Sequence, residues 1–111
     1  MWATWCGPCL REIPSLKQVE KNYHGKNITF VSLSIDAKND HDKWMEMIKE
    51  KELSGIQLFE NEGGRSQFVV DYGIQGIPRF LLIDPDGNII NSNAPQPSST
   101  DLTDLFDELE I

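Results

Sequence analysis

The spacing of apolar residues divides the chain into helices and strands. From Cys6 to about Tyr23, apolar side chains recur every three residues, close enough to the helical period to form one stripe, and this predicts a helix. Pro14 lies inside this stretch and should bend the helix, because proline lacks an N–H and crowds the preceding turn. The next apolar run, residues 28–35, is rich in β-branched side chains and predicts a strand buried on both faces.

The middle of the chain continues this alternation. Apolar residues at helical spacing predict a second helix over residues 40–53, for which Asn39 or Asp40 is available as the N-cap. Residues 56–59 are a short strand candidate, and residues 66–72 are expected to form a short helix. The chain therefore changes from helix to strand and back at short intervals.

Turn and capping residues mark the last third of the chain. Asp84-Pro85-Asp86-Gly87 separates two apolar runs, residues 79–83 and 87–90, and predicts a β-hairpin. The last helix should begin at Ser99 or Thr100, after a loop rich in proline and serine. Its expected buried face consists of Leu102, Leu105, Phe106 and Leu109.

This order of elements indicates one α/β domain over residues 1–111. Helices that alternate with strands, followed by a hairpin, predict a three-layer sandwich in which helices flank a mixed sheet. The chain is 39% hydrophobic and 25% charged, which is typical of a globular protein with a single core. Its net charge of -8 argues against a nucleic-acid partner, because phosphate backbones attract basic patches.

The two cysteines, Cys6 and Cys9, are the candidates for reactive chemistry. Helical spacing places them on one face, close enough to bond each other. A structural disulfide gains most by closing a long loop, so this short loop suits a bond that opens and closes. Cys6 lies at the predicted helix N-terminus, where free N–H groups and the helix dipole favour a thiolate. We expect Cys6 to attack a partner disulfide, and the less exposed Cys9 to resolve the mixed disulfide.

The residues between the cysteines suit the same chemistry. Pro8 fits the first turn, which requires no N–H, and Gly7 leaves the approach to the sulfur open, so both are expected at the substrate-binding surface. Half of a zinc site is the alternative, but His24 and His41 stand at spacings that fit no zinc-finger pattern. We expect neither a metal nor a cofactor.

Several motifs resemble one protein family. Trp5-Cys6-Gly7-Pro8-Cys9 resembles the active-site signature of thioredoxins, and Leu10-Arg11-Glu12-Ile13-Pro14 resembles their TlpA/ResA-like branch, the bacterial extracytoplasmic thioredoxins. Gly76-Ile77-Pro78 is similar to the cis-proline loop of the family, and Asp84-Pro85-Asp86-Gly87-Asn88 resembles the hairpin that follows it. The resemblance runs nearly end to end and implies a thioredoxin-like fold and thiol–disulfide oxidoreductase activity.

The resemblance also implies roles for single residues. Pro78 corresponds to the cis-proline that faces the two sulfurs and helps hold an extended substrate segment; a trans proline that opens a strand is the alternative. Glu12 corresponds to a glutamate that tunes the cysteines and could take up or return the Cys9 proton; an exposed carboxylate favoured by the helix dipole is the alternative. Trp5 is expected both to pack in the core and to form, with Ile77, an apolar rim where the partner docks.

Partners and location follow from the same branch. It implies substrate proteins with disulfides, a thiol electron donor, and a periplasmic or otherwise extracytoplasmic location, often with a membrane anchor; a cytoplasmic location is the alternative. Gly7-Pro8 resembles the reducing members, whereas an oxidant or isomerase is the alternative within the class. A redox-inert binding domain that uses the cis-proline groove is the alternative from another class. The oligomeric state is left open.

Two features of thioredoxins would fall before Met1. These are a strand inside the sheet, directly before the motif, and a buried acidic residue on that strand. We therefore expect the chain to be truncated at its N-terminus and to lack this strand. Such a chain would be unstable alone or would pair its exposed strands with another copy.

Overall fold

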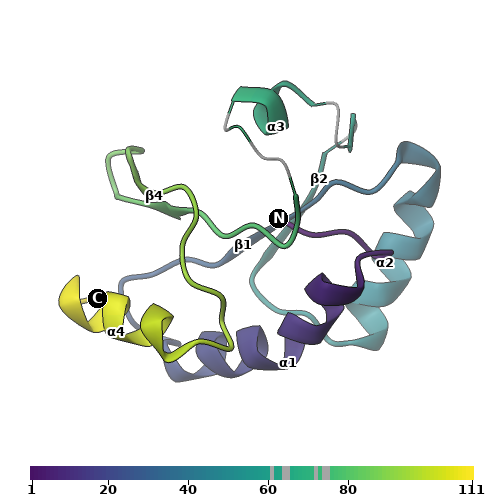
Figure 1. Ribbon diagram of the computed structural model, residues 1–111. Coiled ribbons are helices and arrows are strands. Elements are labelled where there is room, and N and C mark those ends of the chain that lie inside the picture. Colours follow the sequence, from purple (N-terminus) through teal and green to yellow (C-terminus); the bar gives the residue numbers. More distant parts are fainter. Residues whose placement is uncertain (61, 64–65, 72, 74–75) are drawn as a thin grey trace.

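The elements of the protein follow the order predicted from the sequence. The computed structural model describes residues 1–60, 62–63, 66–71, 73 and 76–111 (Figure 1). The helices are α1 (Gly7–Asn22), α2 (His41–Glu50), α3 (Gln67–Asp71) and α4 (Thr100–Glu108). The strands are β1 (Val31–Ser34), β2 (Ile56–Phe59), β3 (Leu82–Ile83) and β4 (Ile89–Asn91). The short helix expected over residues 66–72 is α3, and residue 72 lies outside the described residues.

The helices begin at capping groups that the sequence indicates. α1 begins where the Cys6 sulfur accepts a hydrogen bond from the Cys9 N–H at 3.2 Å. α4 begins where the Ser99 hydroxyl accepts one from the N–H two residues on. Asp40 occupies the N-cap position of α2, but its side chain makes no capping hydrogen bond, because a 3-10 turn (Lys38–Asp40) leads directly into the helix. The predicted starts of α1 and α4 are thus confirmed.

The strands form two pairs. β1 and β2 are parallel neighbours, with Val31 opposite Ile56. β3 and β4 are antiparallel, with an irregularity between Leu82 and Ile83, and they form the predicted hairpin. The mixed character expected for the sheet is present, but it is divided between these two pairs.

Met1 and Trp2 connect the two strand pairs by backbone hydrogen bonds. Trp2 pairs in parallel with the end of β1: its N–H donates to the Leu33 carbonyl at 3.1 Å, and the Ile35 N–H donates to the Trp2 carbonyl at 2.9 Å. On the other side, the Arg79 N–H donates to the Met1 carbonyl at 3.3 Å, and the Met1 amino group donates to the Arg79 carbonyl at 2.6 Å. This short segment therefore lies between β1 and the residues that lead into β3.

A cavity of about 1070 Å³ separates the rest of the two pairs. The carbonyls of Phe30 and Ser34 accept hydrogen bonds from the N–H groups of Ile56 and Glu60, on the side of β2. Main-chain groups alternate in direction along a strand, so those of Val31 point the other way, toward the cavity. Leu81 lines the opposite side. The prediction that this strand is buried on both faces is wrong, because the Val31 side chain is exposed where the cavity, and not a packed layer, adjoins it.

The core consists of two clusters of buried side chains. The first lies between the start of α1 and α2 and contains Trp2, Ala3, Cys6, Cys9 and Trp44. The second lies between the end of α1 and α4 and contains Val19, Leu102 and Phe106. The cysteines are thus part of a packed core and not of a surface loop.

The buried face of α4 is shorter than predicted. Leu102 and Phe106 are buried and Leu105 is half-buried, as expected for an apolar stripe. Leu109 is 40% exposed, however, and the prediction for this residue is wrong. α4 ends at Glu108, so the helical stripe does not continue as far as Leu109.

Figure 1 shows how the helices lie around the strands. α1 and α4 lie along one side of the strand pairs, and α3 lies on the other side, which agrees with the predicted layers. The start of α1, the end of β1 and the segment before β3 meet near the N-terminus. No helix in the described ranges combines the length and the apolar character that crossing a membrane requires.

Candidate active site

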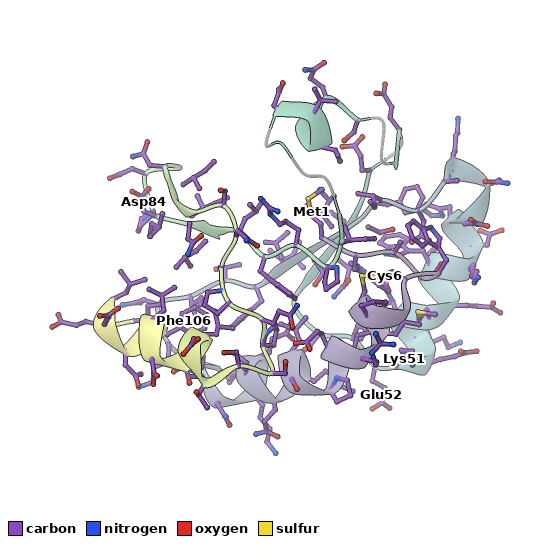
Figure 2. The ribbon with its side chains drawn as sticks, viewed as in Figure 1. Met1, Cys6, Lys51, Glu52, Asp84 and Phe106 are labelled. Atoms are coloured by element: carbon purple, nitrogen blue, oxygen red, sulfur yellow. A yellow bond between two sulfur atoms is a disulfide. The ribbon has the colours of Figure 1, made fainter. Side chains whose placement is uncertain are left out.

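Cys6 and Cys9 form a disulfide at the start of α1. Their Cα atoms are 5.2 Å apart, and the chain turns into the helix between them. Figure 2 shows Cys6 at the first turn of this helix. The Cys9 N–H donates a hydrogen bond to the Cys6 sulfur, so a free N–H group of the helix start points at the sulfur that is expected to be the nucleophile. In the reduced protein this N–H would favour a thiolate at Cys6.

The two cysteines are buried to nearly the same degree. Cys6 is 4% exposed and Cys9 is 3% exposed, so exposure in the disulfide form does not distinguish an attacking from a resolving thiol. The capping hydrogen bond does distinguish them, because it ends on Cys6. The separate roles of the two thiols stay a prediction.

The loop before β3 lies against the disulfide. The Ile77–Pro78 peptide bond is cis. The Ile77 carbonyl oxygen lies 3.9 Å from the Cys6 sulfur, and the next residue but one, Arg79, is hydrogen-bonded to Met1. The structure therefore brings the predicted proline loop and the cysteine pair together, although they are about seventy residues apart in the sequence.

The residues around the disulfide differ in exposure. Trp5 is 60% exposed, Gly7 and Pro8 are exposed, and Ile77 is half-buried. The expectation that Trp5 also packs in the core is wrong, because Trp2 and Trp44 supply the indole rings of the core cluster. Trp5 instead presents most of its ring at the surface beside Cys6.

Glu12 lies one turn along α1 from Cys9. Its carboxylate accepts hydrogen bonds from the Ser98 N–H at 3.0 Å and from the Ser98 hydroxyl at 2.8 Å, and so ties α1 to the loop before α4. Cys9, Glu12 and Pro78 all line the cavity between the strand pairs. A role for Glu12 in moving the Cys9 proton stays a prediction, and its contact with Ser98 is a second function that the sequence did not suggest.

A buried carboxylate beside the motif was missed by the sequence reasoning. Asp36 lies two residues after the buried end of β1 and has no exposed surface. Its oxygens accept hydrogen bonds from Thr4, which stands two residues before Cys6. The pattern Ser34-Ile35-Asp36 contains a signal for it, since two polar side chains on one face at the end of an apolar strand require polar partners.

The two histidines differ in their surroundings. His24 is exposed, and the His41 ring packs edge-on against Phe59 with centroids 4.8 Å apart. In the part of the chain that the structure describes, no three His, Cys, Asp or Glu side chains are grouped so as to hold a metal ion.

These features define a class of protein. A cysteine pair at the start of a helix, opposed by a proline loop and set between helices and mixed strands, is the arrangement of a thioredoxin-fold protein that exchanges thiols and disulfides.

Comparisons with known proteins agree with this class. A family model described as thioredoxin-like matches residues 1–89. The chain is 29% identical over 89 residues to the thiol-disulfide oxidoreductase ResA of Bacillus thuringiensis, an alignment that covers 80% of this chain and 49% of the relative. A solution structure from Bacteroides vulgatus, assigned to the thiol-disulfide oxidoreductases, has a TM-score of 0.83 and 48% identity and covers 98% of this chain and 69% of that one. A thiol-disulfide oxidoreductase from Bacteroides fragilis has a TM-score of 0.83 and 30% identity, over 97% and 76% of the two chains.

The chain belongs to the thioredoxin-like family. The predicted fold class is confirmed by the same comparisons. The chain spans about half the length of the ResA relatives that it matches.

Proposed function

We propose that this protein reduces disulfide bonds in other proteins by dithiol exchange through Cys6 and Cys9. The observation that carries the proposal is the Cys6–Cys9 disulfide at the N-terminus of α1, next to the carbonyl of Ile77. Membership of a family that includes thiol–disulfide oxidoreductases supports it.

The reaction has two exchange steps. In the reduced protein, the Cys6 thiolate attacks one sulfur of a substrate disulfide, a mixed disulfide forms, and the other substrate sulfur leaves as a thiolate. The Cys9 thiolate then attacks the Cys6 sulfur, the Cys6–Cys9 disulfide forms, and the second substrate thiolate leaves. Two electrons pass to the substrate, and a thiol electron donor returns them by the reverse exchange.

The surroundings of the disulfide suit these steps. The Cys9 N–H that points at the Cys6 sulfur stabilises the attacking thiolate. An extended substrate segment would lie along Ile77 and Pro78 and contact the exposed ring of Trp5. Glu12 shares the cavity with Cys9, where its carboxylate could accept the proton that Cys9 must lose before it attacks.

The reducing direction and the location are part of the proposal. Gly7-Pro8 between the cysteines resembles the reducing thioredoxins, and the TlpA/ResA-like branch implies a periplasmic or otherwise extracytoplasmic site, with a cytoplasmic site as the alternative. A membrane-impermeant thiol reagent added to intact cells tests the location. It should label reduced Cys6 if the protein lies outside the cytoplasm, and label it only after lysis in the other case.

Insulin reduction tests the activity. Wild type should turn over, whereas Cys6→Ser and Cys9→Ser should each lose turnover, because each removes one of the two exchange steps. The matched pair also separates the roles: Cys9→Ser should accumulate a mixed disulfide at Cys6, and Cys6→Ser should not. Equal turnover in all three proteins would contradict the mechanism, and peptide binding without turnover in wild type would favour a redox-inert binding domain.

Equilibration with glutathione tests the direction. A potential near that of thioredoxin, about -270 mV, supports a reductase, whereas one near that of DsbA, about -120 mV, would identify an oxidant. Capture of mixed disulfides with Cys9→Ser in cells would then name the substrate protein.

A further inference from the structure

Asp36 is a fully buried acid that takes no part in the exchange steps. It lies two residues after the end of β1, and its side chain has no exposed surface. Burying a carboxylate is costly unless its oxygens are hydrogen-bonded, so the groups around Asp36 must supply hydrogen-bond donors.

The carboxylate of Asp36 is surrounded by hydrogen-bond donors. The Thr4 N–H lies 3.0 Å from one oxygen and 3.1 Å from the other, and the Thr4 hydroxyl donates to the first oxygen at 2.6 Å. The Ser34 hydroxyl donates to the second oxygen at 2.5 Å. Three donors directed at two oxygens suit the acceptor-only, ionised carboxylate.

These hydrogen bonds reach the redox pair through a single turn. Thr4 lies in the turn from Ala3 to Cys6, which the Cys6 N–H closes by donating to the Ala3 carbonyl at 3.1 Å. The Asp36 carboxylate accepts hydrogen bonds from both the backbone N–H and the side-chain hydroxyl of Thr4, the second residue of this turn. The position of Cys6 relative to Cys9 is therefore held by hydrogen bonds to the segment after β1 as well as by the first turn of α1.

We propose that Asp36 is a positioning residue that makes the Cys6–Cys9 disulfide harder to reduce, by holding Thr4 in the turn that leads to Cys6. The inference rests on the proposed thiol–disulfide exchange only for its biological meaning, since the equilibrium of the disulfide can be measured without any substrate protein.

The hydrogen bonds to Thr4 set the direction of the effect. Holding Cys6 in place beside Cys9 raises the effective concentration of one thiol near the other, which favours the disulfide over the dithiol. Removal of the carboxylate should therefore shift the equilibrium toward the dithiol.

The test is the equilibrium constant of the disulfide in glutathione buffers, followed by alkylation and mass. Asp36→Asn should favour the dithiol about tenfold, which corresponds to a potential about 30 mV less negative. Thr4→Val, which removes one hydroxyl donor at nearly constant shape, should shift it less in the same direction, and Thr4→Ser, which keeps the donor, should restore the wild-type value. The control is Asp84→Asn, the same chemical change on the hairpin away from Cys6 (Figure 2).

A purely structural role for Asp36 predicts a different result. It would lower the unfolding midpoint of the oxidised and reduced proteins equally and leave the equilibrium constant unchanged, and that outcome would overturn the inference. If Asp36→Asn does not fold, the comparison of Thr4→Val with Thr4→Ser decides alone. If Asp36→Asn shifts the disulfide–dithiol equilibrium but the wild-type protein does not reduce insulin, the proposed function is contradicted and this inference is supported. If the wild-type protein reduces insulin but Asp36→Asn leaves the disulfide–dithiol equilibrium unchanged, the proposed function is supported and this inference is contradicted.

Discussion

Replacement of Trp5 by alanine should weaken the reduction of protein substrates and leave the fold intact. Trp5 is 60% exposed, and the core around the cysteines takes its indole rings from Trp2 and Trp44. Most of the Trp5 ring therefore already contacts water in the free protein, and its truncation should cost about 1 kcal/mol of stability or less.

The size of the effect on substrates follows from the exposed area. A tryptophan side chain has about 250 Å² of surface, so at 60% exposure roughly 150 Å² of Trp5 is open to a partner. A docked protein that covers half of this area gains ~2 kcal/mol at about 25 cal/mol per Å². Its loss would lower kcat/KM about 30-fold. The change should fall on KM, because the ring contributes equally to binding before and during the exchange.

The assay compares a large and a small disulfide. Trp5→Ala should be impaired with insulin and changed less than about threefold with oxidised glutathione, which is too small to cover the ring. Met45→Ala is the matched control, because Met45 is an exposed apolar residue on α2. Equal losses with both substrates, or a loss of stability like that of a core residue, would show that Trp5 is not a docking surface.

Three further predictions concern the core, a titration and the proton path. Phe106→Ala should lower the free energy of unfolding by about 3–5 kcal/mol, because the ring is buried and packs edge-on against two aromatic rings. Leu109→Ala, at an exposed position, should cost less than about 1 kcal/mol. Urea denaturation measures both variants, and equal losses of stability would contradict the assignment of Phe106 to the core. Partial burial, and then the carboxylate of Asp107 that accepts its hydroxyl, raise the pKa of Tyr23 above its ordinary value of 10.0, so Asp107→Asn should lower it. The difference between ultraviolet titrations of proteins with and without Tyr23→Phe measures this, and an unchanged phenol pKa would refute the cause. Glu12→Gln should slow insulin reduction roughly 10- to 100-fold while keeping the side chain's length, and turnover equal to wild type from pH 6 to 8 would exclude a role in proton transfer.

Local signals in the sequence were sufficient to predict where α1 and α4 begin and where the hairpin turns. The start of α1 at Cys6, the start of α4 at Ser99 and the hairpin turn at residues 84–87 each depend on groups within four residues of one another. Capping and turn chemistry acts over this range, so it can be read without knowledge of the rest of the fold. The cysteine pair could be recognised for the same reason.

The features that the sequence did not reveal depend on distant partners. Asp36 accepts hydrogen bonds from Thr4, 32 residues away, as well as from the neighbouring Ser34, and Glu12 accepts hydrogen bonds from Ser98, 86 residues away. An apolar run shows that the side chains of a strand are suited to burial, but it does not show whether another element covers them. For this reason Val31 was expected to be buried, whereas its side chain is exposed. Such outcomes are set by tertiary packing.

The division of the strands into two pairs places the two sides of the candidate active site on different parts of the chain. Cys6 and Cys9 follow Trp2, which is bonded to the first pair, whereas Pro78 leads into the second pair. The two sides of the disulfide therefore belong to distant parts of the chain, which are joined near Cys6 by the backbone hydrogen bonds of Met1 and Trp2. The second core cluster and the Glu12–Ser98 hydrogen bonds join the same parts of the chain further along α1, so the spacing between the Cys6 sulfur and the Ile77 carbonyl depends on packing well beyond the disulfide itself.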